Sequence, residues 1–186
     1  MIITISGTPG SGKSTVGKML AEKLGWKHYS TGDMRRRAAT SHGMTIEEWN
    51  AYGETNPETD TIVDNEVAEL GRAEDNFIID GRLAWHFIPH AFKVFITVDE
   101  KEGAERIFGD LKSGKRSSQE QHKTIDELIQ ANRMRTLSDE KRYAKYYPGV
   151  IWNDLKTQDL ILDSTNLSPE ATVEQILAKV DVDKGV

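Results

Sequence analysis

The chain has 186 residues, 24 Lys and Arg against 30 Asp and Glu, a net charge of −6 and no cysteine. This length predicts one domain, 1–186, whose core needs no disulfides. The lack of cysteine excludes thiolate nucleophiles and cysteine-ligated metals, and the acidic balance argues against non-specific nucleic-acid binding. The sequence has no run of roughly 20 apolar residues and no basic start of a signal peptide. We therefore expect a cytoplasmic protein without nucleic-acid or membrane partners.

Short apolar, β-branched runs alternate with amphipathic segments along the chain, which is typical of an α/β protein. A helix follows the first run, begins at about Lys13 and ends at Gly25, a residue suited to a C-terminal cap. This alternation predicts a mostly parallel sheet that binds ligands at the carboxyl ends of its strands. The predicted strands cover residues 2–6, 26–30, 77–79, 92–98 and 160–162.

Capping signals predict where the later helices begin. A long helix is also expected to run from about Ser117 toward Tyr147. The expected starts are a capping box of Thr45 and Glu48, Asn56 as the cap before Pro57, a second capping box of Asp99 and Glu102, and Ser168 before Pro169.

Residues 7–14 read GTPGSGKS and match the phosphate-loop pattern G-x-x-x-x-G-K-[ST]. A predicted strand precedes the motif and a predicted helix follows it. The glycines allow several backbone N–H groups to converge on a phosphate at a helix N-terminus. Lys13 supplies a mobile positive charge for the β- and γ-phosphates, and the Ser14 hydroxyl is a ligand for Mg²⁺. The motif therefore predicts a binding site for a magnesium-bound nucleoside triphosphate.

The rest of the sequence favours a small kinase among the phosphate-loop proteins. It contains neither the D-x-x-G nor the N-K-x-D motif of small GTPases. A kinase needs a second anion site, and arginine is the residue best suited to bind phosphate. Two candidates are the run RRR at 35–37, after the second strand, and DGR at 80–82, after the third. The alternatives are a solvated basic helix and a structural ion pair at a strand end.

The phosphate loop, STGDM at 30–34 and DGRLA at 80–84 together resemble the archaeal-type cytidylate kinase family. The likeness extends over NPETD at 56–60 and over nearly the whole chain. It implies a three-layer P-loop kinase sandwich with a five-stranded parallel sheet, a helical monophosphate-binding insertion at about 31–72 and a short helical lid at about 109–142. It also implies transfer of the γ-phosphoryl group of ATP to CMP or dCMP with Mg²⁺, giving ADP and CDP or dCDP. We also expect a monomer.

The motifs and the resemblance together assign site residues. Acceptor binding is expected at Asp33, Arg36, Asp60, Asp80, Gly81 and Arg82, and Mg²⁺ binding at Ser14 and Asp80. Catalytic charge neutralisation is expected from Lys13, Arg82, Arg135 and Arg142, the last two as lid arginines on one helix face. ATP binding is expected at Gly7, Pro9, Gly10, Ser11, Gly12, Lys13, Ser14 and Thr15.

Several alternatives stay open on the sequence alone. The lid arginines could be surface side chains, with Asp139 a ready partner of Arg135. Glu140 stands where the family often has arginine, and a carboxylate there cannot stabilise transferring charge. The acceptor could be another nucleoside monophosphate, such as AMP or UMP, or an alcohol with Asp33 as base. The chain could also be an ATP-binding regulatory module with weak hydrolysis.

Overall fold

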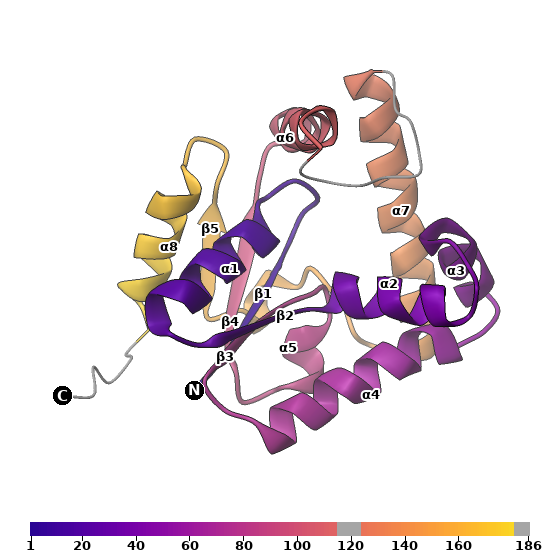
Figure 1. The fold of residues 1–186 in the computed structure, drawn as a ribbon, viewed down its shortest axis with the longest axis horizontal. Coiled ribbons are helices and arrows are strands. Elements are labelled where there is room, and N and C mark those ends of the chain that lie inside the picture. Colours follow the sequence, from indigo (N-terminus) through magenta and orange to yellow (C-terminus); the bar gives the residue numbers. More distant parts are fainter. Residues whose placement is uncertain (115–123, 181–186) are drawn as a thin grey trace.

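The computed structural model describes residues 1–114 and 124–180. Its strands form one five-stranded parallel sheet in the order β2-β3-β1-β4-β5 (Figure 1). Each strand coincides closely with a segment predicted to be a strand, so the predicted parallel sheet is confirmed. The strands are β1 (Ile2–Gly7), β2 (Lys27–Ser30), β3 (Phe77–Asp80), β4 (Phe92–Thr97) and β5 (Leu160–Asp163).

Helices cover both faces of the sheet and complete the predicted three-layer sandwich (Figure 1). The helices are α1 (Lys13–Leu24), α2 (Thr31–Ser41), α3 (Ile46–Gly53), α4 (Glu58–Ala73), α5 (Ala84–Phe87), α6 (Glu100–Lys112), α7 (Ile125–Tyr146) and α8 (Pro169–Leu177). Helices α1 and α8 pack on one face, whereas α2, α4 and α5 pack on the other. Helices α6 and α7 share a separate apolar cluster.

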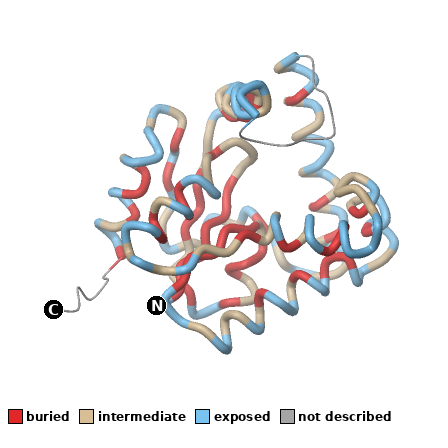
Figure 2. Tube along the Cα trace, viewed as in Figure 1, coloured by how far each residue is buried: buried red, intermediate tan, exposed pale blue. Residues whose placement is uncertain are grey.

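The alternation of side chains along the strands divides the core into two layers. Ile3 and Ile5 of β1 face the cluster formed with α1 and α8. Ile2 faces the opposite cluster, together with Phe77 and Ile79 of β3. Buried residues therefore follow the strands (Figure 2), and the two clusters lie on opposite faces of the sheet, as expected for parallel strands covered on both faces.

The central position of β1 brings two loops together at one edge of the sheet. Strand β1 lies between β3 and β4, with Ile5 opposite Asp80 and Gly7 opposite Ile96. Parallel strands end at the same edge, so the loop after β1 lies beside the residues after β3. This edge carries the two segments for which the sequence predicts anion binding.

One helix start differs from its prediction. The capping box at the start of α3 is confirmed, but α4 begins after Pro57, so the assignment of Asn56 as its cap is wrong. The Asn56 side-chain amide instead donates to the Tyr52 carbonyl oxygen (2.9 Å). This bond satisfies a carbonyl at the end of α3, and the cap position of α4, Pro57, makes no side-chain capping hydrogen bond.

The second predicted capping box is only half formed. The Asp99 side chain caps α6 by accepting from the backbone N–H groups of Lys101 and Glu102 (3.0 and 3.1 Å). Glu102 does not complete the box, because its carboxylate accepts from Arg106 one turn further along (2.8 Å). Ser168 caps α8, as predicted.

The regions predicted as an insertion and a lid consist largely of helices. The predicted insertion at about 31–72 consists of α2, α3 and nearly all of α4. The predicted lid at about 109–142 covers the end of α6 and most of α7, and its residues 115–123 lie outside the described residues. Helix α7 begins at Ile125 with Thr124 as its cap. The start that the sequence predicts, near Ser117, lies outside the described residues. Among the described helices, none has the length and apolar character needed to cross a membrane.

The loop after β1 packs directly on the first turn of α6. A Cβ atom on Gly10 would lie 2.2 Å from the carbonyl oxygen of Gly103, and one on Gly103 would lie 2.6 Å from that of Pro9. Gly10 also has a φ of 77°, a region that favours glycine. The phosphate-loop motif predicts Gly10, but Gly103 lies outside the motif and only the structure identifies it.

We expect Gly103→Ala to displace the loop, because the added methyl group has backbone atoms in its path. Such overpacking destabilises a fold by about 1–3 kcal/mol, and we expect about tenfold weaker binding of MgATP, equivalent to about 1.4 kcal/mol. Calorimetric titration and thermal unfolding measure both effects. The matched control is Gly109→Ala in the same helix, where an added Cβ meets nothing within 4 Å. Equal MgATP affinities in the two variants would contradict this account.

Candidate functional site

The loop at residues 7–14 has the shape of a phosphate cradle. Gly10 and Gly12 both adopt a positive φ, 77° and 82°, and α1 begins directly after the loop at Lys13. The Lys13 ammonium folds back over the loop and donates to the carbonyl oxygen of Thr8 (2.7 Å). The curled backbone, the helix N-terminus and the ammonium group together suit a bound phosphate.

Asp80 ends β3 and faces the first turn of α1. Ser14 Oγ donates to Asp80 Oδ1 (3.0 Å), and Ser30 Oγ donates to the same oxygen (3.2 Å). The other carboxylate oxygen lies 2.9 Å from His28 Nε2. Asp80 and Ser30 are buried. The carboxylate is therefore held from three sides at the edge of the phosphate loop.

Ser14 and Asp80 fit the coordination chemistry of magnesium. Hydroxyl and carboxylate oxygens are ligands that Mg²⁺ accepts, and the ion commonly keeps several waters and shares substrate phosphates. Among residues 1–114 and 124–180, no group of three or more His, Asp or Glu side chains could hold an ion by itself. The pair thus fits an ion that arrives with a nucleotide better than one held in a protein cage.

His28 is a site residue that the motifs did not predict. Its side chain is 12% exposed, and it reaches Asp80 past Gly17 of α1. A Cβ atom on Gly17 would lie 2.8 Å from His28 Nε2. The sequence does contain one signal for His28. Side chains two residues apart in a strand lie on the same face, so His28 lies on the same face of β2 as Ser30.

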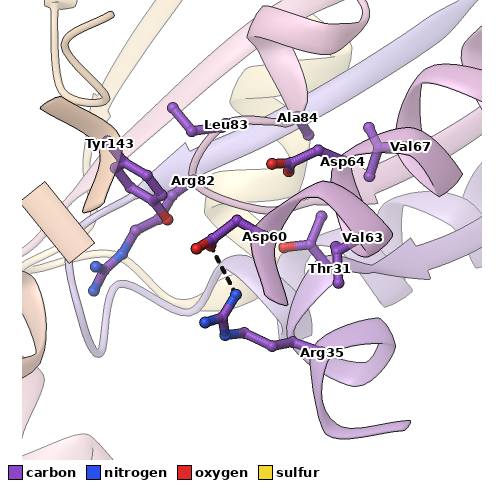
Figure 3. Close-up of a pocket in the computed structure, with 10 residues that line it drawn as sticks. All are labelled: Thr31, Arg35, Asp60, Val63, Asp64, Val67, Arg82, Leu83, Ala84 and Tyr143. Carbon is purple, nitrogen blue, oxygen red and sulfur yellow. Dashed lines mark hydrogen bonds and ion pairs between the residues drawn. The ribbon is translucent and has the colours of Figure 1, made fainter. Parts of the chain in front are cut away.

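A buried network of charges begins at Arg82, just after β3. Its guanidinium pairs with Asp139 of α7, whose other carboxylate oxygen pairs with Arg142. Arg142 Nε in turn donates to Asp60 Oδ2 of α4 (3.1 Å). Asp60 Oδ1 accepts from Arg35 Nη1 of α2 (2.8 Å; Figure 3). Three arginines and two carboxylates from four segments of the chain are thus linked.

The network carries an excess of positive charge in a buried place. Burial lowers the pKa of Arg35 and of Arg82 below the ordinary value for arginine, because loss of water disfavours the charged form. Asp60 and Asp139 offset only two of the three positive charges. A buried excess of arginine charge favours an anionic ligand.

A cavity of about 50 Å³ lies beside this network (Figure 3). Arg35 Nη2 is buried and has no hydrogen-bond partner within the described part of the chain. An unsatisfied buried donor of this kind is costly, so it marks a place where a ligand or water oxygen would bind favourably. The lining residues are Thr31, Arg35, Asp60, Val63, Asp64, Val67, Arg82, Leu83, Ala84 and Tyr143.

The structure brings most of the predicted site residues to this edge but leaves three of them, Asp33, Arg36 and Arg135, exposed elsewhere. The Arg36 side chain is 55% exposed and pairs with Asp33. Successive helix residues point about 100° apart, so Arg35 faces Asp60 and Arg36 faces outward. Arg135 lies exposed two turns before Arg142 on α7. Arg35 therefore lines the cavity, and Arg36 does not.

Gly81 joins the two parts of the site. A Cβ atom on Gly81 would lie 2.3 Å from Thr31 Oγ1, so the chain between Asp80 and Arg82 passes directly against the start of α2. This close approach requires a residue without a side chain between Asp80 and Arg82. It also places Thr31 in the lining of the cavity.

Glu140 contacts the site indirectly. Its carboxylate accepts from Trp152 Nε1 (3.1 Å), and the Arg82 guanidinium lies 5.1 Å from the centre of the Trp152 ring. Such stacking stabilises an arginine over an aromatic face. Glu140 thus fixes the indole on which Arg82 rests. The sequence, in which Glu140 merely replaces the arginine common in the family, did not predict this contact.

Asp64 lies one turn after Asp60 and lines the same cavity. The Tyr147 hydroxyl donates to its carboxylate. Burial nevertheless raises the pKa of Asp64 to about 7, and burial together with the neighbouring Asp64 raises the pKa of Tyr147 above its ordinary value. A substantial fraction of the molecules therefore carries a protonated Asp64 near neutral pH.

The raised pKa of Asp64 predicts a pH-dependent stability. The folded chain holds this proton up to about pH 7, whereas an unperturbed carboxyl loses it near 3.8. The free energy of unfolding therefore falls as the pH rises between these values. We expect Asp64→Asn to be more stable relative to the wild type at pH 8 than at pH 5, by about 2 kcal/mol. Urea unfolding at both pH values measures this, and a constant difference would contradict it.

Comparison with known proteins places the chain among kinases. It matches the model of the cytidylate kinase-like family over residues 2–166. It is 38% identical over 185 residues to a cytidylate kinase of Archaeoglobus fulgidus, covering 99% of this chain and 97% of the relative. A cytidylate kinase of Pyrococcus furiosus is 34% identical over 182 residues, covering 97% of this chain and 88% of the relative.

Solved structures of similar shape support the fold. A shikimate kinase from Bacteroides thetaiotaomicron aligns with a TM-score of 0.66 at 18% identity, covering 98% of this chain and 99% of that one. A shikimate kinase from Aquifex aeolicus aligns with a TM-score of 0.60 at 20% identity, covering 96% of this chain and 95% of that one. At such low identity the likeness bears on the fold alone. The family model and the sequence relatives carry the assignment: the chain belongs to the cytidylate kinase-like family.

Proposed function

We propose that this chain transfers the γ-phosphoryl group of ATP to CMP or dCMP, giving ADP and CDP or dCDP. The observation that carries the proposal is the placement of two anion sites at one edge of the sheet. The phosphate loop after β1 would hold the donor, and the buried arginine cluster after β3 would hold the acceptor phosphate. The name shared by the relatives supplies the identity of the acceptor base.

The reaction requires positioning and charge neutralisation more than proton transfer. An oxygen of the acceptor phosphate forms the new bond to the γ-phosphorus, and the bond to the β–γ bridging oxygen breaks as ADP leaves. With a second pKa near 6, the acceptor phosphate is already largely dianionic at neutral pH and needs no base. Lys13 would act on the donor, and Arg35 and Arg82 on the acceptor.

An alcohol acceptor would need a general base, and the geometry does not favour one. Asp33, the candidate base, has a side chain that is 54% exposed and is paired with Arg36. A base must lie within hydrogen-bond reach of the proton that it removes. The buried arginines instead favour an acceptor that brings its own negative charge.

Magnesium would enter with the nucleotide and be held by the Ser14 hydroxyl, with Asp80 orienting its water ligands. When bound, the ion would neutralise charge on the β- and γ-phosphates. Ser30 and His28 keep the Asp80 carboxylate aimed at the loop. We further propose Arg142 as an acceptor-side residue, because Asp139 links it to Arg82. Arg135 as a lid arginine and the monomeric state stay predictions.

The first experiment measures ADP release from MgATP with CMP, dCMP, UMP, AMP, GMP or no acceptor. We expect strong stimulation by CMP or dCMP alone. Stimulation by a different monophosphate would retain the two anion sites and overturn the assignment of the base. ATP binding without stimulation by any acceptor would refute the kinase proposal and favour a regulatory module.

Neighbouring arginines of α2 provide a matched test of the acceptor site. We expect Arg35→Ala to lower kcat/KM for CMP by about 10²–10³-fold, the usual effect of losing a charged group from a phosphoryl-transfer site. Arg36→Ala removes the same charge one residue later and should change kcat/KM less than about threefold, since exposed ion pairs contribute little. Steady-state kinetics with CMP as the varied substrate distinguishes them. The reverse order would restore the sequence-based choice of Arg36.

A further inference from the structure

The Asp139 carboxylate is bound in the way that a phosphate would be. Its two oxygens accept from different guanidinium groups, those of Arg82 and Arg142. The side chains of Asp139, Arg82 and Arg142 are 9%, 13% and 2% exposed, respectively. Two arginines converging on one small buried anion form the arrangement that proteins use to recognise phosphate and carboxylate groups.

Other contacts hold both arginines in place without Asp139. Arg142 uses Nε to bind Asp60 (3.1 Å) and a different atom, Nη2, to bind Asp139. Arg82 rests on the Trp152 ring at 5.1 Å, and Glu140 fixes that ring. The two guanidinium groups would therefore keep their positions if the Asp139 carboxylate were withdrawn.

Arg82 and Arg142 are already paired with Asp139, beside the cavity of about 50 Å³. A phosphate can reach both arginines only when a group now bound to them moves away. Asp60 is the less mobile of the two carboxylates, because it bridges Arg35 and Arg142 and also accepts a long hydrogen bond from Thr59 (3.4 Å).

We propose that Asp139 occupies the acceptor-phosphate position in the ligand-free protein and is displaced by the acceptor phosphate, so that it sets acceptor affinity. This inference rests on the proposed function. The exchange replaces one anion by another between the same two cations, so that the buried arginines are never left without a counter-ion. Asp139 is accordingly a residue that acts on affinity through Arg82 and Arg142, and it takes no part in the chemical step.

The test is Asp139→Asn in the full chain, with CMP and inorganic phosphate as separate probes in calorimetric titrations without ATP. Removing the competing carboxylate should lower both dissociation constants about tenfold, because a buried like charge opposes anion binding. Asp139→Glu keeps the charge and should not tighten binding. Glu100→Gln is the control, because it removes one negative charge at an exposed pair with Arg133 (2.7 Å) and should leave both constants unchanged.

A purely structural ion pair predicts the opposite result. In that case Asp139→Asn, which loses stability on either account because it leaves a buried charge unpaired, would bind CMP no more tightly than the wild type. Thermal unfolding in phosphate and in chloride of equal ionic strength separates the two accounts. We expect phosphate to raise the unfolding temperature of Asp139→Asn more than that of the wild type, and to restore folding if the variant is unfolded in chloride. An equal response to the two salts would overturn the proposal.

Failure of this inference can be told apart from failure of the proposed function. A wild-type protein that releases no ADP in response to any monophosphate would refute the kinase proposal. A wild-type protein that is active with CMP, together with an Asp139→Asn variant that binds phosphate no more tightly, would refute only the role of Asp139.

Discussion

The parallel pairing of β1 with β3 is the constraint on which the site depends. It sets Ile5 opposite Asp80, so the loop that follows β1 and the segment that follows β3 emerge side by side. Strand β2 pairs with the other edge of β3, with Ser30 opposite Asp80. One carboxylate therefore receives a hydroxyl from α1 and another from the end of β2. A shift of β3 by one residue against β1 would turn the Asp80 side chain to the opposite face of the sheet, and a shift of β2 against β3 would turn Ser30 away from it.

A second constraint is the buried charge network, which joins α2, α4 and α7 to the end of β3. Removing one member of such a network leaves an uncompensated buried charge, at a cost of about 3–5 kcal/mol. The same arginines would bind the acceptor, so stability and affinity depend on one set of groups. This shared dependence explains why kinetic constants of variants in the network need to be read beside their unfolding free energies.

Local patterns predicted much of this molecule. Four of the five strands follow from short apolar runs with β-branched residues, and the phosphate loop follows from a motif that is contiguous in the chain. The network could not be predicted, because its partners are distant: Arg82 and Asp139 are 57 residues apart, and Arg142 and Asp60 are 82 apart. The choice between Arg35 and Arg36 depends on the rotation of α2 about its axis, which is set by the packing of Met34 and Ala38 against neighbouring elements.

A site for a polyanion must hold several cations close together, and here they lie in a buried place. Three arginines with no counter-charge would be too costly to bury, so the chain supplies carboxylates of its own. Asp60 and Asp139 are two such groups, and Asp64, with a pKa raised to about 7, is a third whose charge depends on pH.

When Asp64 is protonated, the cluster keeps one net positive charge; when it is ionised, the cluster is neutral. An incoming dianion would therefore favour the protonated form of Asp64, because binding and protonation at one site are thermodynamically linked. The ligand-free protein thus balances a cluster stable enough to fold against one positive enough to attract phosphate.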